Sequence, residues 1–310
     1  MQSGRVNDVL AILAPGQGAQ KPGFLAPWLE NDVFASTLAE FSEATKLDLA
    51  HLGSHADDDT IRDTAVAQPL LVAAALAAAR ALDVEPHLVA GHSVGELAAL
   101  ALAGVVTDAE AATLVAVRGR AMAEAAAQRP TGMTAVVGGN ADEVLAAIEA
   151  AGLTPANHNG TGQIVAAGTV EQLVALAEHP PHRVRLMPLA VAGAFHTVHM
   201  QPAVQALATA AAQIQPQQPR ITVLSNRDGA SVADGADALE RIVQQVAHPV
   251  RWDQCMDTMR TLGVTGILEL TPAGTLTRIA KRNLRDAEVF DLNTPDQLDD
   301  ARAFVQAHHR

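Results

Sequence analysis

Short apolar segments alternate with longer helical patterns along this chain, and the alternation begins with the apolar run at residues 9–14. Helical patterns follow at residues 33–46 and 66–82, and a short buried strand is predicted at residues 88–90 before a helix resumes at Val94. Strands and helices that alternate in this way form βαβ units, in which helices connect parallel strands. The sequence therefore predicts an α/β fold with a parallel sheet at its core.

The pattern changes between residues 131 and 193, where two short strands follow one another without a helix between them. Gly160 and Gly162 mark the turn that joins these two strands. The expected order is strand 133–137, helix 141–151, strands 154–157 and 163–167, helix 170–178 and strand 183–189. This βαββαβ order is ferredoxin-like. We therefore expect an inserted ferredoxin-like subdomain at residues 131–193 and a large catalytic domain formed by residues 1–130 and 194–310.

Charge and composition exclude several classes of protein. The net charge of −13 disfavours binding to a phosphate backbone, so no nucleic-acid partner is expected. The apolar stretch 65–82 is interrupted by Gln68, Pro69 and Arg80, which favours a buried helix over a membrane span. The single cysteine, Cys255, cannot form an internal disulfide, and no signal-peptide core follows Met1, so a cytoplasmic location is expected.

The pentapeptide Gly-His-Ser-Val-Gly at residues 91–95 lies between a predicted strand and a predicted helix. In that context the G-x-S-x-G pattern indicates a nucleophile elbow, a tight turn that exposes Ser93 at a helix N-terminus. Glycines are needed because a Cβ would collide with the neighbouring backbone. The alternative is a glycine-rich turn with an idle serine, and His92 is interpreted as a structural neighbour.

A serine requires a base to become nucleophilic, and the chain has twelve histidines. His196 lies where the inserted segment returns to the main sheet, just before a helix, which favours it as the base. His199 could share a helical face with His196 as a metal pair, but no third ligand is near, so no metal is expected. His158 and His248 are interpreted as polar or surface residues.

Two further features lie outside the elbow. The segment Gly-Gln-Gly-Ala-Gln at residues 16–20 follows the first strand, lacks the Lys-Ser/Thr pair of a phosphate loop, and could bring a backbone N–H to an oxyanion. Arg118 lies among alanine and valine in a long helix. If it is buried, a carboxylate partner is expected; the alternative is a surface arginine or an internal salt bridge.

Taken together, these motifs resemble those of the bacterial malonyl-CoA:acyl carrier protein transacylases, from about Val9 to Leu284 and in the family's order. The matching elements are residues 16–20, 91–96, Arg118, 193–196, Gln245 and 249–252. The resemblance implies a hydrolase-like α/β domain that carries a ferredoxin-like insert. Ala19 and Val94 differ from the serine and leucine of many relatives, and neither change affects the chemistry.

The resemblance also implies catalytic roles. Ser93 would be the nucleophile and His196 the general base and acid, oriented by the backbone carbonyl of Gln245 in place of a carboxylate. The backbone N–H groups of Gln17 and Val94 would form the oxyanion hole.

Substrate-binding roles are implied in the same way. Arg118 would clamp the malonyl carboxylate, with Gln17 and Asn157 near the substrate. Phe195 precedes the catalytic histidine and would favour malonyl over methylmalonyl, because its ring fills the space of a branched methyl group.

The implied reaction transfers malonyl from malonyl-CoA to the phosphopantetheine thiol of an acyl carrier protein, in fatty-acid or polyketide synthesis. Malonyl-CoA is a substrate, no cofactor is expected, and a monomer is expected. Two alternatives remain: a serine esterase or thioesterase, and a catalytically silent module that binds carrier proteins. The carrier is predicted to dock on a stripe of cations on one helical face, unless that face is only solvated. The stripe comprises Arg278, Lys281, Arg282 and Arg285.

Overall fold

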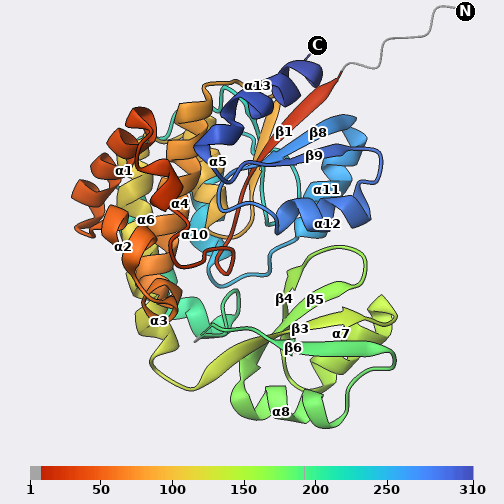
Figure 1. Ribbon diagram of the computed structural model, residues 1–310. Coiled ribbons are helices and arrows are strands. Elements are labelled where there is room, and N and C mark those ends of the chain that lie inside the picture. Colours follow the sequence, from red (N-terminus) through yellow and green to blue (C-terminus); the bar gives the residue numbers. More distant parts are fainter. Residues whose placement is uncertain (1–7, 192, 310) are drawn as a thin grey trace, which may run out of the picture.

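The computed structural model describes residues 8–191 and 193–309, and it contains two separate sheets (Figure 1). The larger sheet has the strand order β7-β2-β1-β8-β9, and every neighbouring pair is parallel. Its strands are β1 (Val9–Ala14), β2 (Leu88–Gly91), β7 (Thr222–Leu224), β8 (Val264–Glu269) and β9 (Glu288–Asp291). The predicted α/β class with a parallel core is confirmed.

Helices cover both faces of this sheet. Successive side chains of β1 point to opposite faces, so Leu10 and Ile12 enter one core while Ala11 and Leu13 enter the other. The first core packs against α1 (Asp32–Thr45), α4 (Thr64–Leu82), α5 (Gly95–Leu102), α6 (Asp108–Ala126), α9 (Gln201–Ala211), α10 (Gly235–Gln245) and α13 (Leu298–Ala307). The second packs against α11 (Trp252–Thr261) and α12 (Leu276–Asn283). The remaining short helices are η1 (Ala26–Trp28), α2 (Leu49–His55), α3 (Asp58–Arg62), η2 (Val198–Met200) and η3 (Pro295–Gln297).

Helix α4 is long and apolar enough to cross a membrane by composition, but 78% of its apolar window is buried inside the protein. It packs between α1 and α6, and the side chain of Asp63 accepts a hydrogen bond from the Ala65 N–H at its start. The structure therefore uses this helix as a core element, as the interrupting Gln68 and Pro69 predicted.

The second sheet is antiparallel, with the order β4-β5-β3-β6. Its elements follow one another as β3 (Thr131–Gly138), α7 (Ala141–Ala150), β4 (Thr154–His158), β5 (Gln163–Thr169), α8 (Val170–Glu178) and β6 (Val184–Pro188). This chain order and strand order are ferredoxin-like, as predicted. The division into residues 131–193 and residues 1–130 with 194–310 stays a prediction of folding units, and residues 1–7, 192 and 310 lie outside the described residues.

The small sheet contacts the large domain through its edge strand β4. The Val250 N–H donates to the Ala156 carbonyl at 2.8 Å, and the His158 N–H donates to the Val250 carbonyl at 2.9 Å. These bonds connect β4 to the segment that follows α10, the helix that ends at Gln245. The contact therefore brings the small sheet next to a predicted site residue.

Candidate active site

Ser93 lies in a sharp turn between β2 and α5, with a φ of 54°. A Cβ at Gly91 would lie 2.0 Å from the carbonyl carbon of Gly95, and a Cβ at Gly95 would lie 2.3 Å from the carbonyl oxygen of Ala14. Neither position has room for a side chain, since these neighbours are backbone atoms. The turn thus has the strained geometry of a nucleophile elbow.

The hydroxyl of Ser93 contacts His196, a buried residue that comes from the segment after the second sheet. The Ser93 Oγ lies 2.8 Å from His196 Nε2, and His196 Nδ1 lies 2.8 Å from the backbone carbonyl oxygen of Gln245. A carbonyl oxygen only accepts, so Nδ1 carries the proton and Nε2 is left as an acceptor facing the serine. The arrangement can take the proton of Ser93.

The environment keeps His196 neutral. Burial lowers the pKa of His196 to about 3, and the positive charge of Arg118 acts in the same direction. A neutral imidazole at working pH is the form that can act as a base.

Arg118 is fully buried on α6, beside the nucleophile. Its Nη1 donates to Gln68 Oε1 at 2.7 Å, and its Nη2 donates to Gln245 Oε1 at 2.8 Å and lies 3.4 Å from Ser93 Oγ. Burial lowers the pKa of Arg118 to about 10, against the opposing effect of Glu96, so the guanidinium stays charged near neutral pH.

The carboxylate expected to pair with a buried Arg118 does not come from the described residues, so both alternatives, a surface arginine and an internal salt bridge, are wrong. Among the described residues no carboxylate lies within ion-pair distance of its guanidinium, and Arg118 Nε has no hydrogen-bond partner. Two neutral amides hold the cation instead. Such an arrangement leaves the positive charge without a paired anion and suits the binding of an external carboxylate.

Gln17 and Val94 come from two different loops, and Val94 belongs to the elbow itself. Val94 immediately precedes α5, and Gln17 follows β1 and lines the cleft between the two sheets. Neither backbone N–H donates to an acceptor in the described part of the chain. The side chain of Gln17 is held separately, by a bond from Nε2 to Thr64 Oγ1 at 3.2 Å.

The cleft between the two sheets has a volume of about 450 Å³. Asn157 and His92 line it, and the Asn157 Oδ1 is buried without a partner among the described residues. His92 Nε2 lies 2.9 Å from Asn159 Oδ1, and the ring of His92 meets the edge of Trp252. Phe195 is buried in the main core and is not among the residues that line the cleft.

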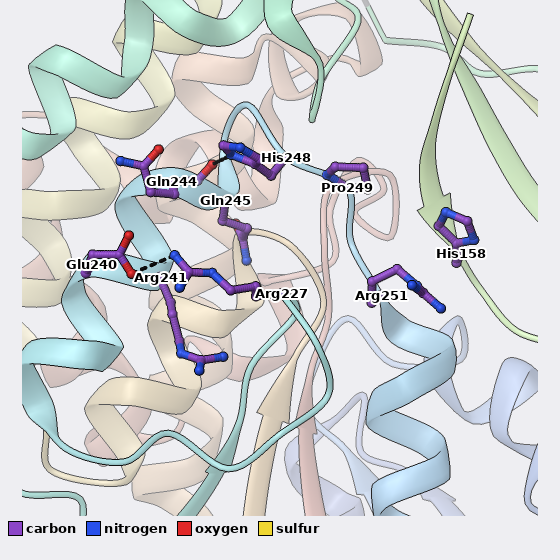
Figure 2. Close-up of a pocket in the computed structure, with 9 residues that line it drawn as sticks. All are labelled: His158, Arg227, Glu240, Arg241, Gln244, Gln245, His248, Pro249 and Arg251. Carbon is purple, nitrogen blue, oxygen red and sulfur yellow. Dashed lines mark hydrogen bonds and ion pairs between the residues drawn. The ribbon is translucent and has the colours of Figure 1, made fainter. Parts of the chain in front are cut away.

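A second pocket, of about 550 Å³, is lined by Gln245 together with arginines from three segments (Figure 2). Its arginines are already paired: Arg227 with Glu240 at 2.6 Å, and Arg251 with Asp253 at 2.7 Å. Arg241 contacts Asp228 and Asp237 in the same way. Ser93 and His196 line neither this pocket nor the cleft, whereas His158 and His248 line this pocket; the cleft contains Gln17 and His92, which lie next to the elbow.

The described residues contain no group of three or more histidine, cysteine, aspartate or glutamate side chains that could hold a metal ion. His199, the other histidine considered for a metal pair, lies in η2.

Three buried polar residues near the site were missed from the sequence. Gln68 contacts Arg118, Asn226 accepts from the Ser93 N–H through Oδ1 at 2.7 Å, and Glu96 contacts both Asn226 and Gln245. A signal for Asn226 was available, because it follows β7 at the carboxyl edge of the parallel sheet, where α/β proteins place their ligands.

Comparison with known proteins matches nearly the whole chain. A family model described as acyl transferase domain matches residues 12–308. A malonyl CoA-acyl carrier protein transacylase of Mycobacterium tuberculosis is 50% identical over 298 residues, which are 94% of this chain and 99% of the relative. One of Escherichia coli K12 is 32% identical over 300 residues, with 93% and 97% covered.

Solved structures show the same similarity. The crystal structure of MCAT from Mycobacterium tuberculosis superposes with a TM-score of 0.92 at 49% identity, covering 95% of this chain and 99% of that chain. A malonyl-transacylase in complex with its type II PKS acyl-carrier protein superposes with a TM-score of 0.89 at 30% identity, covering 95% and 99%.

Proposed function

The chain belongs to the malonyl CoA-acyl carrier protein transacylases, and on that premise we propose that it transfers malonyl from malonyl-CoA to the phosphopantetheine thiol of an acyl carrier protein through an ester on Ser93. One observation carries the proposal: a hydroxyl 2.8 Å from a neutral imidazole also lies 3.4 Å from a buried guanidinium. The imidazole activates the serine. The guanidinium selects an acyl group that carries its own carboxylate.

In the first half-reaction His196 Nε2 takes the proton of Ser93 as Oγ attacks the thioester carbonyl of malonyl-CoA. The carbonyl oxygen becomes an oxyanion, which the backbone N–H groups of Gln17 and Val94 stabilise, each by roughly 2.7–4 kcal/mol. The C–S bond then breaks, and His196 returns its proton to the departing thiolate. Malonyl-Ser93 and free CoA remain.

The carbonyl of Gln245 takes the place of the triad carboxylate. It fixes the tautomer and the ring orientation of His196 through the 2.8 Å bond to Nδ1. A neutral carbonyl stabilises the imidazolium less than a carboxylate would.

The second half-reaction reverses the first with a different thiol. His196 deprotonates the phosphopantetheine thiol, the thiolate attacks the ester carbonyl, and Ser93 leaves with the proton. Because CoA departs before the carrier thiol reacts, ping-pong kinetics are expected.

Arg118 distinguishes this function from that of a serine esterase. Its planar guanidinium donates two parallel hydrogen bonds to a carboxylate, and each bond to a charged group contributes roughly 1.5–3 kcal/mol. Among the described residues only neutral amides hold Arg118, so the malonyl carboxylate pairs with it without displacing an ion pair. Asn157 in the cleft supports substrate binding.

The carrier protein docks on the exposed cations of α12. Arg278, Lys281 and Arg282 are exposed on this helix, and its Leu276 and Ile279 line the cleft on the other side. A partner seated there would have a short path for its phosphopantetheine arm. The fourth member of the predicted stripe, Arg285, lies beyond the end of the helix at Asn283, so the prediction of one continuous helical face was wrong for it.

We further propose that the enzyme needs no cofactor and acts as a monomer in the cytoplasm. The serine hydroxyl, the imidazole, the malonyl-CoA thioester and the carrier thiol supply every group whose bonds the two half-reactions make or break. The single cysteine, Cys255, is buried, which fits a protein that does not depend on disulfides.

The rates at which the acyl-enzyme loses its acyl group to a thiol and to water distinguish this function from the two alternatives. We expect isolated malonyl-enzyme to lose its acyl group to a pantetheine thiol far faster than to water. Equal or faster hydrolysis would indicate an esterase or thioesterase. Failure of malonyl-CoA to label the protein would indicate a catalytically silent carrier-binding module.

A further inference from the structure

Glu96 is a buried carboxylate that the reaction above does not use. It is 2% exposed and follows the elbow in the first turn of α5. Its Oε2 accepts a hydrogen bond from the side-chain Nε2 of Gln245 at 2.5 Å and another from the Asn226 N–H at 3.2 Å. Burial raises the pKa of Glu96 to about 7, while both of these bonds and the positive Arg118 act in the opposite direction.

The partners of Gln245 fix which way its side-chain amide points. Its Nε2 faces three acceptors: Glu96 Oε2, the Asn226 Oδ1 at 3.1 Å and the Ser93 carbonyl oxygen at 3.1 Å. An amide nitrogen only donates and an amide oxygen only accepts. With Nε2 held among acceptors, Oε1 points to Arg118 Nη2, at 2.8 Å.

A reversed amide would be unfavourable at both ends. The oxygen would face three acceptors, and the NH₂ group would face the guanidinium donor of Arg118. Glu96 contributes the shortest of the three contacts to Nε2, and it is the only one of the three acceptors that can carry a formal charge.

We propose that Glu96 is a positioning residue for acyl selection, which holds the Gln245 amide so that its oxygen aligns the Arg118 nitrogen nearest to Ser93. The inference rests on the proposed function, in which Arg118 binds the malonyl carboxylate. No ion pair joins Glu96 to Arg118 in the described part of the chain, so Glu96 positions the guanidinium through the Gln245 amide, and its direct effect on Arg118 is a longer-range attraction.

The remaining contacts of Arg118 cannot replace this alignment. Its Nη1 donates to Gln68 Oε1, and among the described residues the Gln68 nitrogen has just one partner, the sulfur of Met122 at 3.5 Å. Its Nε has no partner among the described residues. The Gln245 oxygen is therefore the more firmly held of the two amide acceptors that orient the guanidinium.

The test measures kcat/KM for malonyl-CoA and for acetyl-CoA in Glu96→Leu, which fills similar space but accepts no hydrogen bond. We expect the malonyl-to-acetyl ratio to fall by at least about fivefold, with the loss on the malonyl side. Glu96→Gln keeps an acceptor oxygen and should retain the parent ratio within about twofold. If Glu96→Leu does not fold, Glu96→Asp becomes the deciding variant. Its side chain is one methylene shorter, so its carboxylate oxygen lies farther from Gln245 Nε2.

Cys255→Ala is the matched control. Cys255 is buried in the same region and donates to the Ser225 carbonyl; it touches the network only through a 4.0 Å contact from Asn226 Nδ2 to its sulfur, and it does not contact Gln245. We expect this control to keep the parent ratio even if it lowers stability.

A ratio that falls by less than fivefold in the deciding variant, or falls equally in the Cys255→Ala control, overturns the role of Glu96. Arg118→Ala is measured in parallel to test the clamp itself. A shifted ratio in Arg118→Ala with an unchanged one in Glu96→Leu rejects only this inference, whereas an unchanged ratio in Arg118→Ala rejects the clamp on which it rests.

Discussion

Arg118 Nη2 lies 3.4 Å from Ser93 Oγ, so a fixed positive charge adjoins the nucleophile inside the protein. A buried cation in this place makes the binding free energy of an acyl group less favourable when that acyl group has no negative charge of its own. It also lowers the proton affinity of the adjacent His196. Arg118 therefore affects both which acyl group binds and whether the base, His196, is protonated.

Arg118→Ala should shift the malonyl-to-acetyl preference toward acetyl by more than about tenfold, because only malonyl loses a bidentate pair. The measurement is kcat/KM for both thioesters on folded variant protein. Acylation of Ser93 by acetyl-CoA serves as the control that the nucleophile still reacts. An unchanged ratio would mean that Arg118 does not bind the malonyl carboxylate.

The pH dependence of stability should report the buried, neutral His196. Its pKa is about 3 in the folded protein, against an ordinary value of 6.5, so the unfolded chain binds the extra proton as pH falls. The contribution of neutral His196 to the free energy of unfolding is fully present above pH 6.5, and it is lost progressively as pH falls toward 3. Between pH 7 and pH 5 the parent should lose about 2 kcal/mol more unfolding free energy than His196→Gln.

Urea denaturation of both proteins at the two pH values measures this difference. The comparison cancels the titration of groups that both proteins share, including Glu96. Equal losses of unfolding free energy in the parent and in His196→Gln would show that His196 takes up its proton in the folded state.

Reversal of charge on α12 should weaken transfer to the carrier protein. In the double variant Arg278→Glu, Lys281→Glu we expect a higher KM for an acidic carrier, with the difference shrinking as salt is added. Acylation by malonyl-CoA should be unaffected. Arg120→Glu, an exposed reversal on α6, is the control. Identical carrier kinetics at low salt would reject α12 as the docking face.

Much of the fold could be predicted because its signals are local. The apolar run of β1 and the glycines around Ser93 follow from burial and from close backbone approach, and both are visible in the sequence. Strand β9 was missed, since its four residues begin with Glu288 and end with Asp291 at the edge of the sheet. Edge strands with charged ends carry no apolar alternation to identify them.

The site residues also fall into two groups, those that a local motif predicts and those that only long-range packing brings together. The roles expected for Ser93 and His196 came with motifs, and the structure brings these two side chains into contact. Glu96 and Asn226 are 130 positions apart, and their contact depends on how β2 and β7 pair in the sheet. The amide partners of Arg118 were missed for the same reason, because long-range packing decides which polar group faces a buried charge.

Intact-mass spectrometry after mixing with malonyl-CoA tests the central claim most directly. We predict one malonyl adduct per chain, mapped to Ser93 by peptide analysis, and none on folded Ser93→Ala. His196→Ala should acylate far more slowly at neutral pH, because no neighbouring base takes the serine proton. A stable malonyl adduct on Ser93→Ala, or no adduct on the parent protein, would contradict the account.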